Sequence, residues 1–330
     1  MKVKLGIIGT GIAARELHLP PLRNLKDEFE ITCVCNHTEK KAKEFAGLVG
    51  GVPYFLDYRE LLARNDVDAV DVILPIHLNC KVTLDSLEAG KHVIVEKPLA
   101  SNIEDAELMR TFPERFDSVM MVAENYRYNP LFRRIKELID AGAIGEPYSV
   151  FWDQMSVMDV ENKYAKTTWR IDHKYPGGLV MDAGIHNIAV LRDLFGEVKS
   201  GIAFNRSVNP EIGRMDSMSF QFVFENGVNG VFNMYFSAQG LSRNQLLILG
   251  SEGSLVIEEN RILLKREGNP DTEETVRTDR GYQGQFEDFH DAIINHKKPV
   301  STFDEAFKDF RTMLLALDSA MKWGELNFTA

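Results

Sequence analysis

Two side chains that can exchange a proton stand four residues apart in the second half of the chain. Asp182 and His186 follow Tyr175-Pro176-Gly177-Gly178, a turn that predicts the start of a helix. Their spacing places both on one face of that helix. The histidine could take the proton of an alcohol while a hydride leaves the carbon, and the carboxylate could orient the imidazole or bind a neighbouring hydroxyl. On spacing alone, an Asp–His pair whose side chains only hydrogen-bond to each other is more common than a catalytic pair.

A glycine-rich segment near the N-terminus has the spacing of a dinucleotide phosphate loop. It reads Gly9-Thr10-Gly11-Ile12-Ala13-Ala14 and lies between the apolar run Val3–Ile8 and a helical pattern. Gly9 permits a tight turn, Gly11 lets the backbone approach a pyrophosphate, and Ala14 allows close packing of helix on strand. The helix N-terminus offers free N–H donors to the phosphate. A plain strand–helix turn is the alternative, but the position favours the dinucleotide site.

The end of the second strand indicates which dinucleotide the site would take. An NAD site usually carries a carboxylate there, for the ribose 2′-hydroxyl. The chain instead reads Cys35-Asn36-His37-Thr38-Glu39-Lys40-Lys41. Asn36 does not repel a 2′-phosphate, and Thr38 can cap the next helix and donate its hydroxyl. Either lysine can supply a cation, which favours NADP although a glutamate lies beside them. An ordinary capped helix with solvated lysines is the alternative.

Strand-like and helical patterns alternate over the first third of the chain and would position these residues. The short apolar runs are Val3–Ile8, Ile31–Cys35, Ala69–Leu74, His92–Glu96 and Ser118–Ala123. Such strands, separated by helices, predict a buried parallel sheet with right-handed crossovers. We therefore expect an α/β protein whose residues 1–124 form a doubly wound, Rossmann-type dinucleotide-binding domain.

The hydrophobic period changes in residues 125–330, which predicts a second, α+β domain. Apolar and polar residues alternate from Met218 to Phe224, turn at Asn226-Gly227, and alternate again to Phe236, as in a hairpin. We expect a mainly antiparallel open sheet with helices on one face and an apolar face suited to a homodimer or homotetramer interface. Helical patterns follow at Phe286–Asn295 and at about 304–323, and the last helix could pack back on the first domain.

Lys97 ends the fourth predicted strand, at the edge where ligands bind in open α/β sheets. Pro98 keeps Lys97 out of the helical region, and Glu96 could pair with Lys97 or touch a cofactor. A surface lysine at a strand end is the plainer interpretation of Lys97 taken alone.

The motif around Lys97 resembles the signature of the Gfo/Idh/MocA oxidoreductases, which include glucose–fructose oxidoreductase and inositol dehydrogenase. It reads Gly90-Lys91-His92-Val93-Ile94-Val95-Glu96-Lys97-Pro98-Leu99-Ala100. The resemblance spans nearly the whole chain. It also includes the glycine turn, the segment Asn125-Tyr126-Arg127-Tyr128-Asn129-Pro130, Trp169-Arg170, and Gly177-Gly178 through Asp182 to His186.

The resemblance implies a role for each matching residue. Lys97, Asp182 and His186 would be catalytic, with the substrate between Lys97 and the Asp182/His186 helix. Substrate binding would involve these three with Arg127 and Tyr282. The cofactor would contact Gly9, Thr10, Gly11, Ile12, Ala13, Asn36, His37, Thr38, Lys41, Pro75, Asn79, Glu96, Lys97, Asn125, Trp169 and Arg170. The alternatives are a salt bridge between domains for either arginine, a core position for Trp169 and a loop aromatic for Tyr282.

The sequence departs from the family pattern at one position. Many relatives carry P-x-x-x-H after the third strand, whereas this chain reads Pro75-Ile76-His77-Leu78-Asn79. Asn79 can still form a hydrogen bond, but the contact that the family histidine makes with ribose or substrate is in doubt. His77 comes two residues early and is expected to face elsewhere.

Composition bounds the partners of the chain. Its 330 residues suggest about two domains. The net charge of −11 disfavours nucleic acid or an anionic membrane as a main partner. Three cysteines are too few for a disulfide framework, and with no predicted signal peptide or membrane span we expect a cytoplasmic protein. The histidines, His18 among them, have no metal-ligand spacing, so no metal is expected.

These observations favour an NAD(P)-dependent enzyme, NADP preferred, that transfers a hydride between nicotinamide and a sugar, polyol or diol carbinol carbon. His186 would be the acid or base, and Lys97 would stabilise the developing alkoxide. Two alternatives stay open. One is glycoside cleavage through transient oxidation by a tightly held NAD(H), and the other is a non-catalytic, cofactor-sensing regulator on the same fold.

Overall fold

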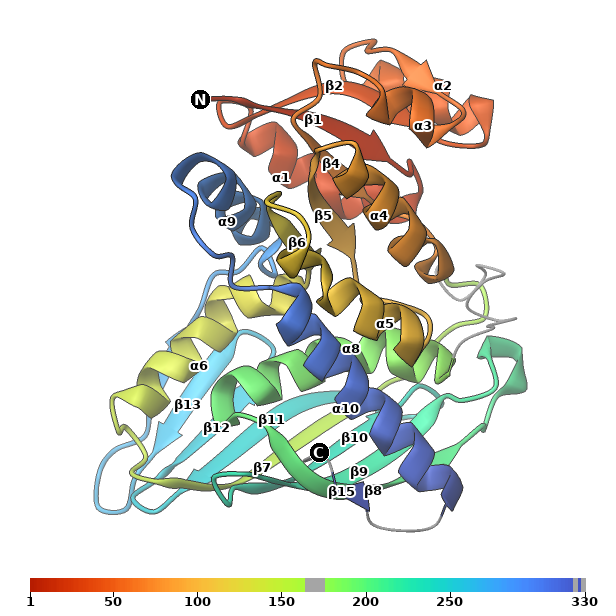
Figure 1. Cartoon of the computed structure of the whole chain (residues 1–330). Coiled ribbons are helices and arrows are strands. Elements are labelled where there is room, and N and C mark those ends of the chain that lie inside the picture. The colour runs from red at the N-terminus through yellow and green to blue at the C-terminus, as the bar shows by residue number, and fades with distance from the viewer. Residues whose placement is uncertain (164–175, 323–325, 328–330) are drawn as a thin grey trace. The chain divides into compact units, whose positions relative to one another are not determined.

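The computed structural model describes residues 1–163, 176–322 and 326–327, and the chain divides into two compact units (Figure 1). The first unit takes in Met1–Tyr128 and Gly281–Lys308. The second takes in Asn129–Arg280 and Asp309–Ala330. Each unit is therefore built from two separate stretches of the chain.

The first unit contains the predicted parallel sheet, in the order β3-β2-β1-β4-β5-β6. Every pairing in it is parallel. The order runs outward on both sides of β1, as a doubly wound fold requires, so the predicted fold class is confirmed. The strands are β1 (Val3–Ile8), β2 (Phe29–Cys35), β3 (Tyr54–Phe55), β4 (Ala69–Val72), β5 (His92–Glu96) and β6 (Met120–Ala123).

Helices cover both faces of this sheet, because its strands are apolar on both sides. Val3, Leu5 and Ile7 of β1 share a buried cluster with Phe286 and Phe289 from the returning segment. At Gly6, which points the other way, an added Cβ would lie 2.8 Å from Leu61. The helices of the unit are α1 (Leu19–Asn24), α2 (Glu39–Leu48), α3 (Tyr58–Leu62), α4 (Asn79–Glu88), α5 (Ile103–Arg110) and α9 (Tyr282–Asn295), with short 3-10 turns η2 (Ile76–Leu78), η3 (Phe112–Glu114) and η4 (Asn125–Tyr128).

The helix that follows the glycine turn is widened in its middle. Ala14–His18 forms a π turn, η1, in which the Leu19 N–H bonds to the Ala14 carbonyl. Pro20 and Pro21 follow at once and have no N–H to donate, so the regular helical ladder cannot continue through them. Such turns often occur at functional sites, and this one ends on a fully buried histidine, His18.

The second unit is built on a mainly antiparallel sheet, in the order β14-β13-β12-β11-β7-β10-β9-β8-β15. The predicted hairpin is present: β9 and β10 pair antiparallel across Asn226-Gly227, with Gly227 at φ 89°. Within this sheet, β7 and β10 are the only described strands that pair in parallel. The strands are β7 (Pro147–Met155), β8 (Val198–Arg206), β9 (Ser217–Phe224), β10 (Asn229–Tyr235), β11 (Arg243–Gly250), β12 (Ser254–Glu258), β13 (Arg261–Lys265), β14 (Thr272–Thr275) and β15 (Leu326–Asn327).

Long helices lie along one face of this second sheet (Figure 1). They are α6 (Pro130–Asp140), α8 (Gly178–Phe195) and α10 (Phe303–Lys322), of which α10 begins in the first unit; a short turn, η5, covers Pro210–Ile212. Among the described residues, no helix combines the length and apolar character needed to cross a bilayer.

Two local predictions need correction. The helix expected at Phe286–Asn295 begins four residues earlier, at Tyr282, because Gly281 adopts φ 86° and serves as its N-cap. Tyr282 therefore lies on a helix and not on a loop before it. Thr38 occupies the N-cap position of α2, but its side chain makes no capping hydrogen bond. Asn36 instead stabilises the turn just before the helix, where its Oδ1 accepts the Thr38 N–H at 2.9 Å.

Candidate functional site

The glycine turn has room for a dinucleotide pyrophosphate. Gly9 adopts φ 104°, and a Cβ there would lie 2.0 Å from the Ile73 carbonyl oxygen, so only glycine fits. At Gly11 an added Cβ would meet no atom of the chain within 4 Å, which leaves the backbone open to a ligand. The fully buried Thr10 Oγ1 has no hydrogen-bond partner among the described residues. Buried polar atoms rarely stay unpaired, so this turn fits a polar cofactor.

Lys97 is held by its neighbours at the same edge of the sheet. Its N–H donates to Oε2 of Glu96 at 3.0 Å. Asn79 donates from Nδ2 to the carbonyls of Glu96 at 2.8 Å and Pro98 at 3.0 Å, on either side of the lysine. Because β1, β4 and β5 are adjacent and parallel, their carboxyl ends place this segment beside the glycine turn.

Asn79 therefore has a structural contact that its place in the motif does not reveal. Its amide group holds the backbone around Lys97, while its own Oδ1 is buried without a hydrogen-bond partner within the chain. An acceptor in that state fits a bound group that carries a hydroxyl or amide donor. Contact between Asn79 and a cofactor remains a prediction. His77 is exposed, two residues earlier on η2.

A buried histidine joins this edge, and sequence reasoning missed it. His18 lies between two carboxylates, with Nδ1 2.8 Å from Oδ2 of Asp71 and Nε2 2.8 Å from Oε1 of Glu96. Burial by itself lowers the pKa of His18, but the charges and hydrogen bonds of Asp71 and Glu96 outweigh it and raise the pKa to about 10. The ring is therefore an imidazolium at neutral pH.

A signal for this cluster was present in the sequence in part. Asp71 is the one charged residue inside an otherwise apolar run, Ala69–Leu74, and a buried carboxylate needs a cationic partner. The partner could not be read from spacing, because His18 is 53 residues away along the chain. The three side chains bond to one another, and no group of metal-ligating side chains is found in the part of the chain that the structure describes.

The predicted adenosine end of the site contains one further cation. Asn36, Thr38 and Lys41 lie at the β2–α2 junction as expected. Arg15, on η1, reaches this region: its Nη2 lies 3.5 Å from the Lys41 carbonyl oxygen and 3.4 Å from Oε2 of Glu44. Arg15 is ion-paired with Glu44, so the cation that it brings to this junction already has a carboxylate partner. His37 is exposed at the same junction.

Asp182 and His186 lie in the first half of α8, in the second unit. Nearly all of α8 is buried, and its half-exposed residues there are Asp182, Ala183 and His186, which share one face. The prediction that the acid and the histidine lie on the same face of a helix is confirmed. A polar pair in the one accessible stripe of a buried helix suits proton exchange with a ligand.

The remaining predicted residues fall into three groups. Asn125 and Arg127 are buried on η4 of the first unit, where Arg127 lies 3.8 Å from Glu305. Pro75 and Tyr282 are half-buried at the starts of η2 and α9. Trp169 and Arg170 lie outside the described residues.

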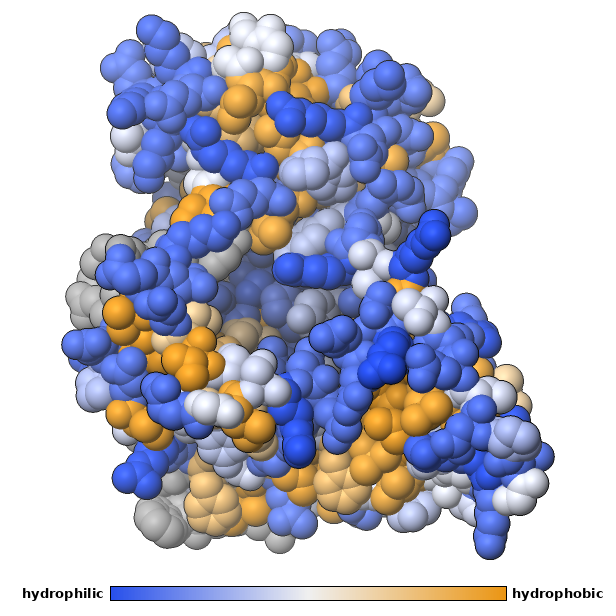
Figure 2. All heavy atoms as spheres, turned by 180° about the vertical axis from the view of Figure 1, so that it is seen from behind, coloured by the Kyte–Doolittle hydropathy of each residue, from blue (hydrophilic) through white to orange (hydrophobic). Residues whose placement is uncertain are grey.

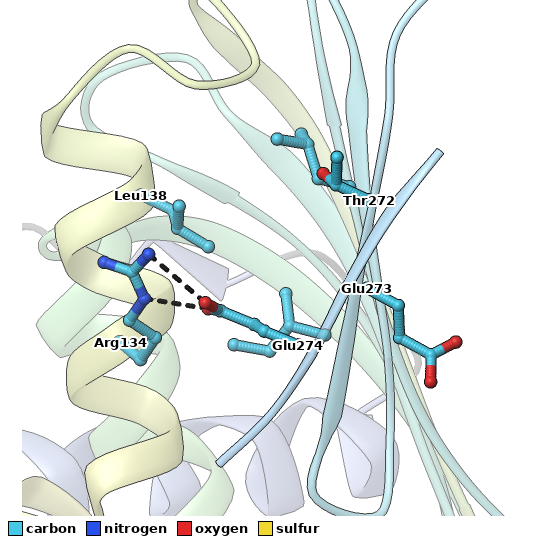
Figure 3. A pocket seen from close by; sticks show the side chains of 7 residues that line it. Arg134, Leu138, Thr272, Glu273 and Glu274 are labelled. Carbon is cyan, nitrogen blue, oxygen red and sulfur yellow. Dashed lines mark hydrogen bonds and ion pairs between the residues drawn. The ribbon is translucent and has the colours of Figure 1, made fainter. Parts of the chain in front are cut away.

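A shallow cavity of about 230 Å³ is found elsewhere in the second unit, between α6 and the β13–β14 ribbon (Figure 3). Arg134 spans it, with Nε 2.8 Å from Oε1 of Glu274 and Nη2 3.3 Å from Oε2. Its only cationic group is thus already paired with a carboxylate of the chain. None of the predicted site residues lines this cavity.

Two family models match the chain, and they follow its two sheets. The model of the oxidoreductase family with the NAD-binding Rossmann fold matches residues 3–124. The model of the GFO/IDH/MocA C-terminal domain matches residues 132–256. The first match covers the glycine turn and Lys97, and the second covers Asp182 and His186.

Known relatives match over nearly their whole length. An oxidoreductase from Thermotoga maritima, known from a crystal structure, is 37% identical to this chain in sequence. The two structures match with a TM-score of 0.93, over 100% of this chain and 99% of the other. An uncharacterised Saccharomyces cerevisiae protein is 29% identical over 98% of this chain and 97% of its own. The D-xylose 1-dehydrogenase [NADP(+)] of Haloarcula marismortui is 26% identical, and the match covers 94% of this chain and 89% of that enzyme. The chain therefore belongs to the Gfo/Idh/MocA family of NAD(P)-binding oxidoreductases.

Proposed function

We propose that this oxidoreductase prefers NADP and exchanges a hydride with the carbinol carbon of a sugar, polyol or diol. The observation that carries the proposal is the sheet edge of the first unit, where Lys97 is held beside an open glycine turn. The pair of Asp182 and His186 on α8 supplies an acid–base group of the kind that alcohol oxidation needs.

Each of three side chains has one task in the proposed reaction. A bound nicotinamide supplies hydride exchange with the carbinol carbon. His186 takes the hydroxyl proton in oxidation and returns it in reduction, while Asp182 orients the imidazole or binds an adjacent hydroxyl. Lys97 places its ammonium charge against the oxygen on which negative charge develops, and so lowers the barrier.

A matched set of variants tests these roles. Steady-state absorbance at the NADPH band would be followed with a panel of aldoses, polyols and diols. We expect His186→Gln and Lys97→Ala to lower kcat by roughly 10²–10⁴-fold, the usual contribution of one acid–base or charge-stabilising group. The dissociation constant of NADPH should stay within about threefold in His186→Gln, because His186 is not among the expected cofactor contacts and its loss would affect the chemical step. Asp193→Asn, on the same helix, serves as the control.

The outcomes of this assay separate the proposal from its alternatives. Net reduction or oxidation of cofactor with a polyol or sugar supports it. Product formation from a glycoside with constant cofactor absorbance would favour transient oxidation instead. Tight NADPH binding without turnover of any substrate would favour a regulator.

The preference for NADP rests on Asn36, Thr38 and Lys41, with Arg15 nearby. None of the residues 35–38 carries the carboxylate that usually binds the ribose 2′-hydroxyl of NAD. The relative from H. marismortui is named for NADP(+). Titration with NADPH and NADH, followed by nicotinamide fluorescence, tests this preference.

We expect Lys41→Gln and Arg15→Gln each to weaken NADPH binding by roughly tenfold, the worth of one charge-assisted phosphate contact, and to leave NADH binding unchanged. Lys43→Gln, at another exposed position of α2, is the control. Tighter binding of NADH than of NADPH by the unchanged protein would contradict the preference.

We further propose that the protein pairs as a homodimer or homotetramer through the open face of the second sheet. Phe151 is 39% exposed there and lies in register with Val231 on one side and Leu247 on the other. Leu247 continues the row to Val256. Figure 2 shows apolar patches on the surface of this unit.

Light scattering tests the proposed pairing. Phe151→Glu should yield monomers, whereas Tyr148→Glu, outside the row, should not. A monomeric unchanged protein would refute the proposal.

A further inference from the structure

The cluster of His18, Asp71 and Glu96 connects directly to the backbone of Lys97. One oxygen of Glu96 meets His18 at 2.8 Å, and the other accepts the N–H of Lys97 at 3.0 Å. The carboxylate is planar, so its rotation cannot change one contact without disturbing the other. The orientation of His18 is thereby transmitted to the peptide unit that precedes the lysine side chain.

His18 is itself held firmly from three elements of the first unit. Asp71 fixes its Nδ1 from β4, and Glu96 meets its Nε2 from the end of β5. From α9, Phe286 contacts the ring edge-on, with ring centroids 5.4 Å apart. The His18 and Asp71 side chains are fully buried, and the Glu96 side chain is 14% exposed.

Burial of such a cluster is unfavourable for the free energy of folding taken alone. Taking one cation and two carboxylates out of water costs several kcal/mol per ion, and apolar residues of similar size would often serve the fold as well or better. A buried cluster of this kind at a ligand-binding edge points to a role in the site.

We propose that His18 is a positioning residue for Lys97. Through Glu96 it fixes the strand-end backbone from which the lysine reaches its ligand, while Asn79 holds the carbonyls on either side. Asp71 acts one step further away, by holding His18. The inference rests on the proposed function for the reaction in which Lys97 takes part. The coupling of His18 to Lys97 does not depend on that function and is tested separately.

The experiment uses the full-length protein and three variants of the cluster. His18→Leu removes both contacts, His18→Gln keeps a donor toward Glu96 without the charge, and Asp71→Asn removes only the distal charge. His92→Gln is the matched control: His92 lies on the same strand as Glu96, is half-buried, and accepts the Val119 N–H at 2.9 Å without touching Glu96.

Two measurements are made on each variant. The first is kcat, KM and the NADPH dissociation constant with whichever substrate the panel identifies. The second measurement is competitive acylation of lysines across a range of pH, which needs neither cofactor nor turnover. Peptide mass spectrometry gives the acylation rate of Lys97 relative to the rates of the exposed Lys2 and Lys40.

We expect His18→Leu to lower kcat by about 10–100-fold, as loss of a supporting contact does in other sites, with unchanged NADPH affinity. His18→Gln should retain more activity than His18→Leu. The relative acylation rate of Lys97 should change by about threefold or more, equivalent to half a pKa unit, in both His18 variants. His92→Gln should change neither measurement.

Loss of thermal stability in His18→Leu with wild-type kcat and Lys97 acylation would overturn the inference, because the cluster would then serve the fold alone. If no substrate is turned over, acylation decides: a changed rate at Lys97 supports positioning while the proposed function fails, and an unchanged rate refutes positioning. If His18→Leu does not fold, ¹⁵N NMR of the unchanged protein and of His18→Gln remains. Loss of a ring proton from His18 near pH 7 would refute the proposal.

Discussion

Each of the two units contains a cluster of one cation and two carboxylates, and the clusters differ in burial and in what they touch. In the second unit, the buried Arg192 of α8 pairs with the buried Asp309 of α10 and donates from Nη2 to the partly exposed Glu197 at 2.6 Å. It connects two helices and the segment before β8, ten residues from Asp182 along α8. In the first unit, His18 meets Asp71 and Glu96, and Glu96 contacts the backbone of Lys97.

The difference shows that a buried ion cluster is not by itself a sign of function. A guanidinium stays charged at every pH at which proteins remain folded, and it can hold two carboxylates while doing nothing else. An imidazolium keeps its proton only through its neighbours, so its charge depends on the local structure. The cluster that titrates is also the one in contact with the candidate catalytic lysine.

The largest effect is expected from a substitution that breaks the cluster of the second unit. Arg192→Leu would leave Asp309 buried without its cation, and we expect the free energy of unfolding to fall by about 3–5 kcal/mol. Urea unfolding measures this loss. The folded fraction at low temperature should keep the kcat of the unchanged protein, and Arg110→Leu, which removes an exposed ion pair with Asp304, should cost less than about 1 kcal/mol. A selective loss of kcat would place Arg192 in the site.

A second prediction concerns pH. The pKa of His18 is raised from 6.5 to about 10, so its contribution to stability is complete below pH 6.5 and is lost as pH rises toward 10. The free energy of unfolding should fall by up to about 1.4 kcal/mol for each pH unit in that window. The cluster around Arg192 should contribute no such slope.

The control for the pH prediction is His18→Gln, which should lack this slope. Burial raises the pKa values of Cys33, Cys35 and Cys80, and these thiols destabilise the protein above pH 9 in both variants. The difference between the two curves therefore isolates His18. Parallel curves between pH 6.5 and 9 would mean that His18 is not protonated in the folded protein.

A third prediction sharpens the role of the first cluster. Asn79→Ala removes the clamp on the carbonyls around Lys97, and we expect kcat to fall by roughly 10–100-fold, because small displacements of a reacting group are costly. Thr83→Val, one turn later on α4 and fully buried, is the control for packing. Equal kcat values for the two variants would show that the clamp does not position Lys97.

The smallest expected effect concerns the other lysine of the same motif. Lys91 is buried, and its Nζ donates to the carbonyls of Arg64 at 2.8 Å and Val67 at 2.9 Å. Lys91→Met should cost about 1–3 kcal/mol of stability and leave kcat unchanged, because two buried carbonyls lose their donor. A fall in kcat that exceeds the loss of folded protein would contradict this separation.

Much of the fold was predictable, because each strand of the first unit is a short apolar run and each turn has a local signal. The hairpin at Asn226-Gly227 and the pairing of Asp182 with His186 on one face depend only on neighbours in sequence. Some elements were not predicted. The strand β3, the helix α3 and the edge strand β14 are two to five residues long, too short for a hydrophobic period to emerge. The helix α6 and the strands β7 and β8 are longer, so shortness does not explain why they were missed.

The sequence by itself determined the parallel sheet, the glycine turn at its edge, and the family through the motif that contains Lys97. These features are local, since backbone conformation and hydrophobic period are set by residues a few positions apart. Tertiary contacts alone reveal that His18 meets Glu96, next to Lys97, and that Asn79 holds the carbonyls on either side of this lysine. Strand order brings together residues 53 and 78 positions apart, and a buried charge finds its partner through that order and not through spacing.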